Sequence, residues 1–154
     1  MKKSYYFILF LIINFGGLAL GSWLMENGPM SAWYVELNKA PWTPPGWVFG
    51  VAWTTIMIFF SWYLAELFHN RGSEFLWLLY AFQLCLNVSW NWIFFSQHRT
   101  TLGLLVIAML TLVILYYFIT FRNDRLKYAK YLLLPYLIWL CIATSLNGYV
   151  VFNN

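Results

Sequence analysis

The sequence predicts an all-α integral membrane protein, a bundle of five transmembrane helices, from its composition and its apolar runs. Hydrophobic residues make up 62% and charged residues 9% of the 154 residues, whereas a soluble domain averages about 45–50% apolar and about 25% charged residues. About 20 apolar residues are needed to cross the hydrocarbon core of a bilayer. Five windows of that size follow one another, so residues 1–154 are expected to form a single membrane domain.

The five windows are joined by short connections, except after the first. In chain order they are Tyr5–Met25, Gly46–Phe68, Phe75–Phe95, Leu102–Phe121 and Tyr128–Phe152. Helix–helix loops usually have about 2–8 residues, but the first loop, Glu26–Thr43, is much longer. Long loops often act as lids over functional sites. This one has room for a short amphipathic helix near Ser31–Asn38.

Proline and tryptophan residues lie near the expected start of the second helix, and a further proline lies in the fifth window. Thr43 precedes two prolines and is expected to act as the N-cap of the second helix. The rings of Trp42 and Trp47 suit a membrane–water boundary, where the indole N–H stays hydrated. Pro135 lies within the fifth window and is expected to kink that helix or to mark its first turn. We place a functional cavity beneath the proline-rich segment Pro41–Gly50.

Lysine and arginine residues predict the orientation, because cytoplasmic loops carry most of them. One side of the membrane is expected to hold Lys2, Lys3, Arg71, Arg122, Arg125, Lys127 and Lys130. The other side holds Lys39 and Arg99. This bias suits a bacterial cytoplasmic membrane with the N-terminus in the cytoplasm and the C-terminus outside. The net charge of +4 forms no basic stripe, so membrane lipid is an expected partner and nucleic acid is not.

Ionisable residues near the middle of the spans are lacking, which limits the chemistry. Glu66 lies near the end of the second window, close to His69 and Arg71, and a boundary charge is the favoured interpretation. His69 and His98 fall on opposite sides of the membrane, so we expect no metal site. The spans contain no Ser-His-Asp set and no paired carboxylates. Hydrolytic chemistry therefore has no candidates, and an ion-driven transporter is disfavoured.

Polar residues in the third window repeat with helical spacing. Gln83, Asn87 and Asn91 stand at i, i+4 and i+8 and share one helical face, with Trp90 beside them. Amides in hydrocarbon need partners, so this face should point into the bundle. Two interpretations stay open here. The amides could serve only interhelical hydrogen bonds, or they could present donors and acceptors to a ligand in a cavity.

A second face with the same spacing occurs in the fifth window. Trp139, Ala143 and Asn147 combine a large ring, a small side chain and an amide, which would suit the wall of a pocket. Ordinary core packing explains the pattern nearly as well. Trp53 in the second window is accompanied by Met57 and Phe60, a stripe that is more typical of a core than of a cofactor site.

The motifs so far described occur together in one known family. The chain resembles the translocator protein family, also called the tryptophan-rich sensory protein or peripheral benzodiazepine receptor family. The resemblance covers nearly the whole chain. Its most specific motifs are Trp42–Gly46, Asn87–Trp90 with Phe94 and Phe95, and Pro135–Trp139 with Ala143–Asn147.

The resemblance implies a homodimer of five-helix bundles that binds small molecules in a pocket under the first loop. The implied ligands are porphyrins such as protoporphyrin IX, and synthetic isoquinoline carboxamides or benzodiazepines; no further cofactor is implied. Carried over by motif, the pocket is lined by Tyr34, Pro44, Trp53, Asn87, Trp90, Asn91, Trp139, Ala143 and Asn147. For some bacterial members, the resemblance implies a light-dependent porphyrin-degrading activity. Residues that match Trp53 and Trp139 are implicated in it.

Two departures from the family pattern limit what is carried over. Family members often have an acidic residue in the fourth helix, and Leu102–Phe121 has none. The cholesterol motif of vertebrate members needs a basic residue after Tyr149, and none follows.

From the polar and aromatic faces and the family resemblance, we expect a tetrapyrrole-binding membrane protein that acts in porphyrin sensing, transport or disposal. The alternatives are an enzyme for light-dependent oxidation of bound porphyrin and a transporter of another small solute.

Overall fold

Five long helices make up most of the protein in a computed structural model, which describes residues 2–121 and 126–154. They are α1 (Lys3–Leu24), α3 (Gly46–Arg71), α4 (Glu74–Asn91), α5 (Thr100–Thr120) and α6 (Leu134–Asn153). A π-helical turn, η2 (Trp92–Ser96), continues α4, and a 3-10 segment, η3 (Ala129–Leu133), leads into α6. Each of the five is part of a segment long and apolar enough to cross a membrane. The predicted class is confirmed, and the described residues contain no strand.

The helix bounds differ from the predicted windows by a few residues. The largest extension is in α3, which continues to Arg71. The first loop contains η1 (Gly28–Met30) and the short helix α2 (Ala32–Glu36), within the range expected for one. Pro135 lies in the first turn of α6, one of its two predicted positions, where a missing N–H leaves no bond unmade. Arg122 and Arg125, which entered the charge count, lie outside the described residues.

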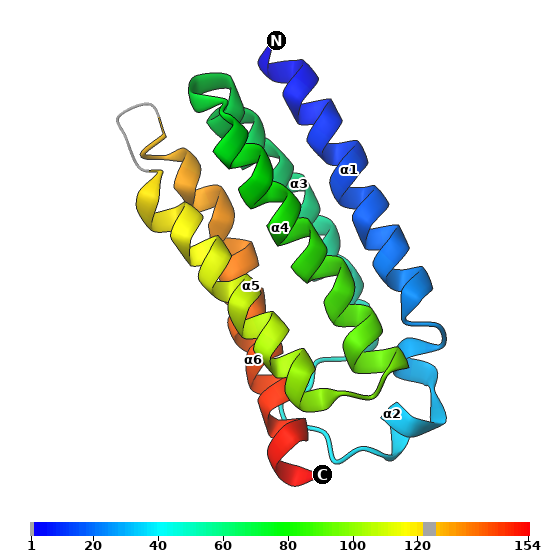
Figure 1. The fold of residues 1–154 in the computed structure, drawn as a ribbon. Coiled ribbons are helices and arrows are strands. Elements are labelled where there is room, and N and C mark those ends of the chain that lie inside the picture. Colours follow the sequence, from blue (N-terminus) through cyan, green and yellow to red (C-terminus); the bar gives the residue numbers. More distant parts are fainter. Residues whose placement is uncertain (1, 122–125) are drawn as a thin grey trace.

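The helices close into a ring of neighbours (Figure 1). Helix α1 packs against α3 and α4, α5 packs against α4 and α6, and α3 completes the ring through η3 and α6. The two termini lie at opposite ends of the bundle, and α2 lies at the same end as the C-terminus (Figure 1). The loop that was expected to cover a cavity is thus placed across one end of the bundle.

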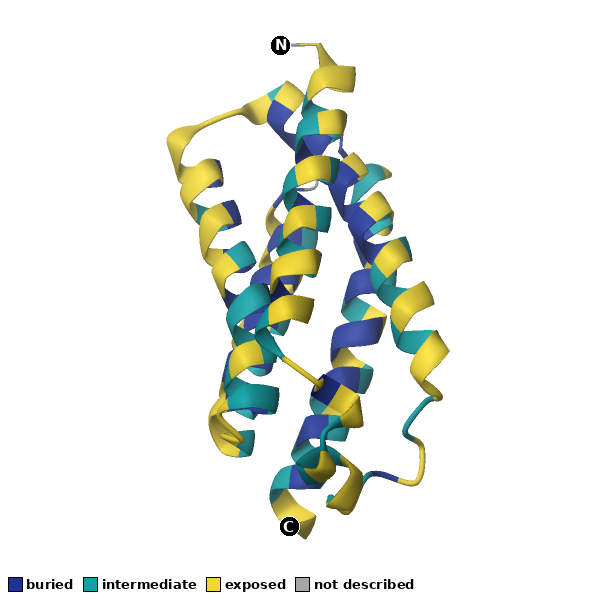
Figure 2. Cartoon of the chain, turned by 90° about the vertical axis from the view of Figure 1, so that its right-hand side faces the viewer, coloured by how far each residue is buried: buried dark blue, intermediate teal, exposed yellow. Residues whose placement is uncertain are grey.

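Buried side chains follow the inward faces of the helices, whereas exposed ones follow the outward faces (Figure 2). The interior is rich in aromatic residues, among them Phe10, Phe60, Tyr63 and Phe68, each no more than 2% exposed. The outward faces carry many large apolar side chains, such as Ile12 at 66% exposure. Lipid tails are as apolar as these side chains, so the bundle is held by packing and interhelical hydrogen bonds rather than by burial from water.

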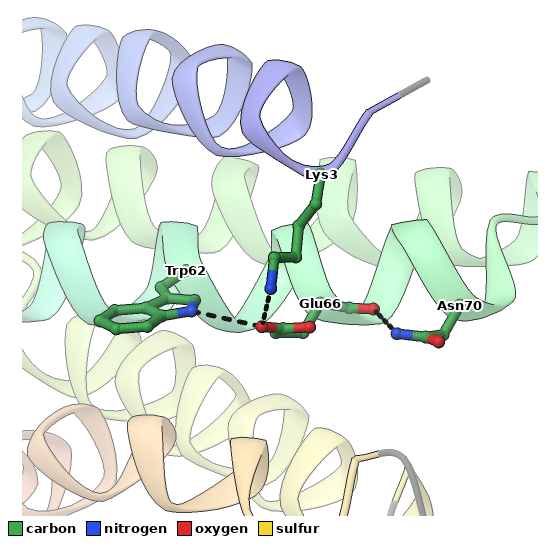
Figure 3. Close-up of polar contacts among 4 residues, drawn as sticks. All are labelled: Lys3, Trp62, Glu66 and Asn70. Atoms are coloured by element: carbon green, nitrogen blue, oxygen red, sulfur yellow. Dashed lines mark hydrogen bonds and ion pairs between the residues drawn. The ribbon is translucent and has the colours of Figure 1, made fainter.

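The one ion pair among the described residues joins α1 to α3 near the N-terminal end (Figure 3). The Lys3 ammonium lies 2.8 Å from a Glu66 carboxylate oxygen, which also accepts a 3.4 Å hydrogen bond from the Trp62 indole. The Glu66 backbone carbonyl accepts a 2.7 Å bond from Asn70. Glu66 thus has the place expected of a boundary charge, with Lys3 as its partner.

Candidate functional site

The first loop forms a roof across the end of the bundle that carries the C-terminus (Figure 1). We use "roof" for residues 26–45. Ring stacking holds it at α2, because Trp33 lies parallel to His98 with ring centroids 4.1 Å apart and planes at 12°. A hydrogen bond holds its far end, where the Trp42 indole N–H donates to Ser145 Oγ on α6 at 3.1 Å.

A third attachment joins the middle of the roof to the end of α6. The backbone N–H of Asn38 donates to Oδ1 of Asn154 at 2.8 Å, and Nδ2 of Asn154 donates back to the Asn38 carbonyl at 3.1 Å. A longer bond of 3.4 Å runs from the Asn38 side chain to the Asn153 carbonyl. The side chain of Asn154 thus pairs with both backbone polar groups of Asn38 and pins the roof to the bundle.

The start of α3 corrects the prediction for Thr43. The helix begins at Gly46, its N-cap position is occupied by Pro45, and no side chain caps it. Thr43 instead donates its hydroxyl to the Ala40 carbonyl at 2.6 Å and so stabilises a turn within the roof. The N-cap prediction was wrong because two prolines delay the helix: a residue before proline is pushed toward extended conformations.

A cavity beneath the roof brings together most of the predicted site residues. Its empty volume is about 1060 Å³ when its open mouth is included, and the volume accessible to a water-sized group is about 320 Å³. The second value lies at the lower end of the usual range of about 300–1,000 Å³ for small-molecule sites. The predicted residues that line it come from the roof, α3 and α4. They are Tyr34, Pro44, Trp53, Asn87, Trp90 and Asn91.

A second, smaller cavity adjoins the first and reaches α6. Its empty volume is about 430 Å³, and it shares Tyr34, Phe49 and Trp90 with the larger cavity. Its wall on α6 includes Ala143 and Asn147, the other two predicted residues of that helix face. Residues from the roof, α3, α4 and α6 therefore converge on one hollow region.

Trp139 is placed differently from the rest of the predicted set. It lines neither cavity and is 5% exposed. The ring of Phe49 meets it edge-on, with centroids 5.1 Å apart and planes at 89°, and Phe49 is one of the residues that line both cavities. The spacing of Trp139, Ala143 and Asn147 did predict a shared face, but a side chain from α3 covers the deepest member of that face.

The amides of α4 face the bundle, as the spacing predicted, but they have two different environments. Gln83 is buried and donates to the hydroxyl of Tyr136 on α6 at 2.8 Å, an interhelical hydrogen bond. Asn87 and Asn91 line the larger cavity. Nδ2 of Asn91 donates to the Asn87 carbonyl at 3.3 Å, and the Asn87 side chain makes no hydrogen bond to the described residues. Interhelical hydrogen bonding thus fits Gln83, whereas contact with a ligand in a cavity fits Asn87 and Asn91.

Asn147 connects three helices beside the smaller cavity. Its Oδ1 accepts a hydrogen bond from the Trp90 indole at 3.1 Å, and its Nδ2 donates to the Thr100 carbonyl at 2.9 Å. Gly103 makes room for it, since a Cβ there would lie 3.1 Å from Oδ1 of Asn147 and 3.2 Å from the ring of Phe94. This amide is fully engaged in fixing the wall that α4, α5 and α6 form.

Several residues of the walls were not predicted. Helix α1 contributes Gly17, Leu18 and Ser22 to the larger cavity, and its C-cap residue Met25 adds to the same wall. The signal that could have found this wall is the glycine pair Gly17 and Gly21, since small residues let helices approach closely. A Cβ at Gly21 would lie 2.6 Å from Nδ2 of the cavity residue Asn91.

The turn η2 was also not predicted, and it shapes the wall. Its π-helical bonding places Phe95 in both cavities and Phe94 in the smaller one. Phe94 also stacks on Trp90, with ring centroids 5.3 Å apart. Such turns occur often at functional sites. Apolar periodicity does not signal this turn, because its residues Trp92–Phe95 are as apolar as those of a regular membrane-spanning helix.

The cavity walls carry little charge. Among the described lining residues only Lys39 is charged at neutral pH. Burial raises the pKa of the Tyr34 hydroxyl above its ordinary value, so this phenol stays protonated and can donate a hydrogen bond. The site therefore offers aromatic faces, amides, a phenol and one ammonium group, a combination suited to binding rather than to acid–base catalysis.

The sequence matches the TspO/MBR family over residues 8–152. The chain belongs to this family. A tryptophan-rich sensory protein of Cereibacter sphaeroides is 37% identical over 116 residues, which cover 75% of this chain and 72% of that protein. The tryptophan-rich protein TspO of Bacillus cereus is 30% identical over 152 residues, or 96% and 94% of the two chains.

The family extends to animals. The human translocator protein is 29% identical over 147 residues, which cover 83% of this chain and 78% of the human protein. Membership of the TspO/MBR family and five apolar helices establish an integral membrane protein. The resemblance recognised from the motifs of the sequence is thereby confirmed.

Proposed function

We propose that the protein binds a tetrapyrrole, protoporphyrin IX or a close relative, beneath the roof and acts in porphyrin sensing, transport or disposal. The observation that carries this proposal is a cavity of about 320 Å³ walled by Trp53, Trp90 and Phe95. Aromatic faces can stack on a flat macrocycle. The amide of Asn87 makes no hydrogen bond to the described residues and can bind polar edges of such a guest. Isoquinoline carboxamides and benzodiazepines also carry aromatic rings and belong to the same proposal.

Titration of the purified protein with protoporphyrin IX in detergent, followed by the shift of the Soret band, tests the proposal. Trp53→Ala should weaken binding about tenfold, since stacking on an aromatic ring and its buried area contribute on the order of 1 kcal/mol or more. Trp23→Ala is the matched control, because Trp23 is 75% exposed on α1 and lines neither cavity. Unchanged affinity in both Trp53→Ala and Asn87→Ala would contradict the proposal.

A second candidate function is light-dependent oxidation of the bound porphyrin by dioxygen. It is favoured by the position of Trp53, an oxidisable ring in the cavity wall whose edge meets Tyr136 with centroids 6.0 Å apart. Illumination of the complex should then bleach the Soret band faster than in empty micelles, and Trp53→Phe should slow the bleaching. Trp139, which Phe49 separates from the cavity, should matter less. Equal bleaching in protein and in empty micelles would dismiss this function.

The placement in the membrane follows from the charges. We infer from these charges that the end bearing Lys2, Lys3 and Arg71 faces the cytoplasm, so that the roof and Asn154 lie outside. From membership of the TspO/MBR family we also infer that two copies associate as a homodimer. A cysteine at position 154, with Cys85 and Cys141 replaced by Ser, should react with a membrane-impermeant maleimide added to intact cells. Sedimentation in detergent measures the association state. A third candidate, transport of another small solute, predicts uptake into vesicles that contain the protein.

A further inference from the structure

Among the described residues that line the two cavities beneath the roof, only Lys39 carries a charge. It lies in the roof, is partly buried, and lines both the larger and the smaller cavity. Its ammonium has no carboxylate within ion-pair distance among the described residues, whose one ion pair is Lys3–Glu66. A partly buried cation without an anionic neighbour is complementary to an anionic group brought by a ligand.

The ammonium is held by the roof itself. It donates hydrogen bonds to the carbonyls of Tyr34, Val35 and Leu37 at 2.9, 3.0 and 3.3 Å. It also lies 5.0 Å from the centroid of the Tyr34 ring. These carbonyls are at the C-terminal end of α2, where a cation is favoured by the helix dipole. The charge is therefore fixed at the edge of the cavities rather than extended into solvent.

One of these bonds can be released without leaving a carbonyl unpaired. The Tyr34 carbonyl also accepts the backbone N–H of Leu37 at 3.3 Å. If the ammonium turns one N–H from this carbonyl toward the cavity, Tyr34 keeps its second partner. The hydroxyl of Tyr34, which belongs to the same cavity walls, is a neutral donor that can bind the other oxygen of a carboxylate.

We propose that Lys39 recognises a carboxylate of the ligand and orients it, with the acidic edge under the roof and the ring system deeper, against Trp53. This inference rests on the proposed porphyrin binding and names the group that selects an acidic member of that class. It predicts that the protein discriminates between a porphyrin diacid and its neutral diester. The aromatic walls do not make that distinction, and the neutral amide and phenol donors make it less strongly than an ammonium group does.

The experiment is a comparison of four affinities. Protoporphyrin IX and its dimethyl ester are each titrated against the unaltered protein and against Lys39→Met, a variant of similar length without the charge. We expect Lys39→Met to weaken binding of the diacid about tenfold, the scale of one charge-assisted hydrogen bond, and to leave binding of the diester unchanged. Arg99→Met is the matched control: it removes an exposed cation at the same end of the bundle that lines neither cavity.

The diester separates charge recognition from a purely structural role. If Lys39 only holds the roof together, Lys39→Met weakens both ligands equally, and the inference is overturned. If the variant weakens neither ligand, Lys39 is overturned as the recognition group while porphyrin binding stands. If the unaltered protein binds neither form, both the inference and the proposed function fall. Lys39→Arg, which keeps the charge, should retain a preference for the diacid, and loss of that preference in this variant would again contradict a role of the charge.

Discussion

At the N-terminal end of the bundle, the rings of Phe10, Phe68, Trp77 and Tyr80 pack on one another with centroids 4.6–5.7 Å apart. At the roof end, aromatic rings instead surround an empty volume of about 1060 Å³. Both ends draw on the same residue types and the same helices. Rings at the roof end also contact one another, as Trp90 and Phe94 do, but they leave one side open to the cavity.

The buried amides show the same contrast. Nδ2 of Asn14 donates to Ser61 Oγ at 2.8 Å, and its Oδ1 accepts the Tyr80 hydroxyl at 2.8 Å, so three helices are joined. Asn87 lines the cavity with a side chain that makes no hydrogen bond to the described residues. A buried polar group is costly unless it is paired. One amide is therefore expected to stabilise the protein and the other to serve a ligand.

The largest expected effect is at the packed end. Phe10→Ala removes a ring that is 0% exposed and contacts four other aromatic rings, and it should lower the free energy of unfolding by about 3 kcal/mol. Unfolding from mixed micelles with a denaturing detergent measures this. Phe95→Ala at the cavity wall is the counterpart and should cost much less. Equal losses would erase the contrast between the two ends.

The next prediction concerns the two amides. Asn14→Ala leaves the Tyr80 hydroxyl without its partner and should cost about 1–2 kcal/mol of unfolding free energy, with little change in porphyrin affinity. Asn87→Ala should do the reverse, weakening the ligand and sparing stability. The same unfolding assay and a Soret titration on both variants supply the four values. A variant that lowered both the unfolding free energy and the porphyrin affinity would show that its amide serves stability and ligand binding together.

Gly21 on α1 tests the comparison between the packed end and the roof end at the boundary of the cavity. A Cβ at Gly21 would lie 2.6 Å from Nδ2 of Asn91, so Gly21→Ala should displace this amide, which is the mobile end of a side chain. We expect a several-fold change in ligand affinity and a change in unfolding free energy below about 1 kcal/mol. Gly16→Ala is the control, because a Cβ there meets nothing within 4 Å. An affinity that Gly21→Ala leaves unaltered would mean that the position of Asn91 is unimportant.

The smallest expected effect is on the roof. Asn154→Ala removes both hydrogen bonds between its side chain and the backbone of Asn38, and a net loss of about 1 kcal/mol corresponds to roughly fivefold faster ligand release. Stopped-flow dilution of the loaded protein measures the release rate. Asn153→Ala is the matched control, because the Asn153 side chain bonds only to Tyr149 within its own helix. Identical rates in the two variants would show that this clasp does not limit release.

Much of the fold could be predicted from the sequence, because length and apolarity decide whether a helix can span a membrane. The five spans and the helix in the first loop were found in this way. The N-cap at Thr43 was not, since local capping preference was overridden by two prolines that hold the chain extended. The turn η2 was not predicted either, because it changes the bonding pattern without changing the apolar character of the chain.

For the candidate site, spacing predicted which side chains share a face but not what covers them. Asn87 and Asn91 reach the cavity, whereas Gln83 on the same stripe finds Tyr136 first. Phe49 lies between Trp139 and the cavity, a contact between two helices that the pattern of either one alone does not contain. The wall from α1 was missed for the same reason. The motif resemblance indicated where the candidate site lies. Only the three-dimensional packing shows which of its residues line the cavity and which support the lining residues.

The amide of Asn147, bonded to Trp90 of α4 and to the first turn of α5 at Thr100, makes one side of the binding chamber inflexible. The opposite side is the roof, which is attached to the bundle at three points by a ring stack and a few hydrogen bonds. We expect a ligand to enter and leave by displacement of the roof while the membrane-embedded helices stay together. The lipid around the protein then need not rearrange during this exchange.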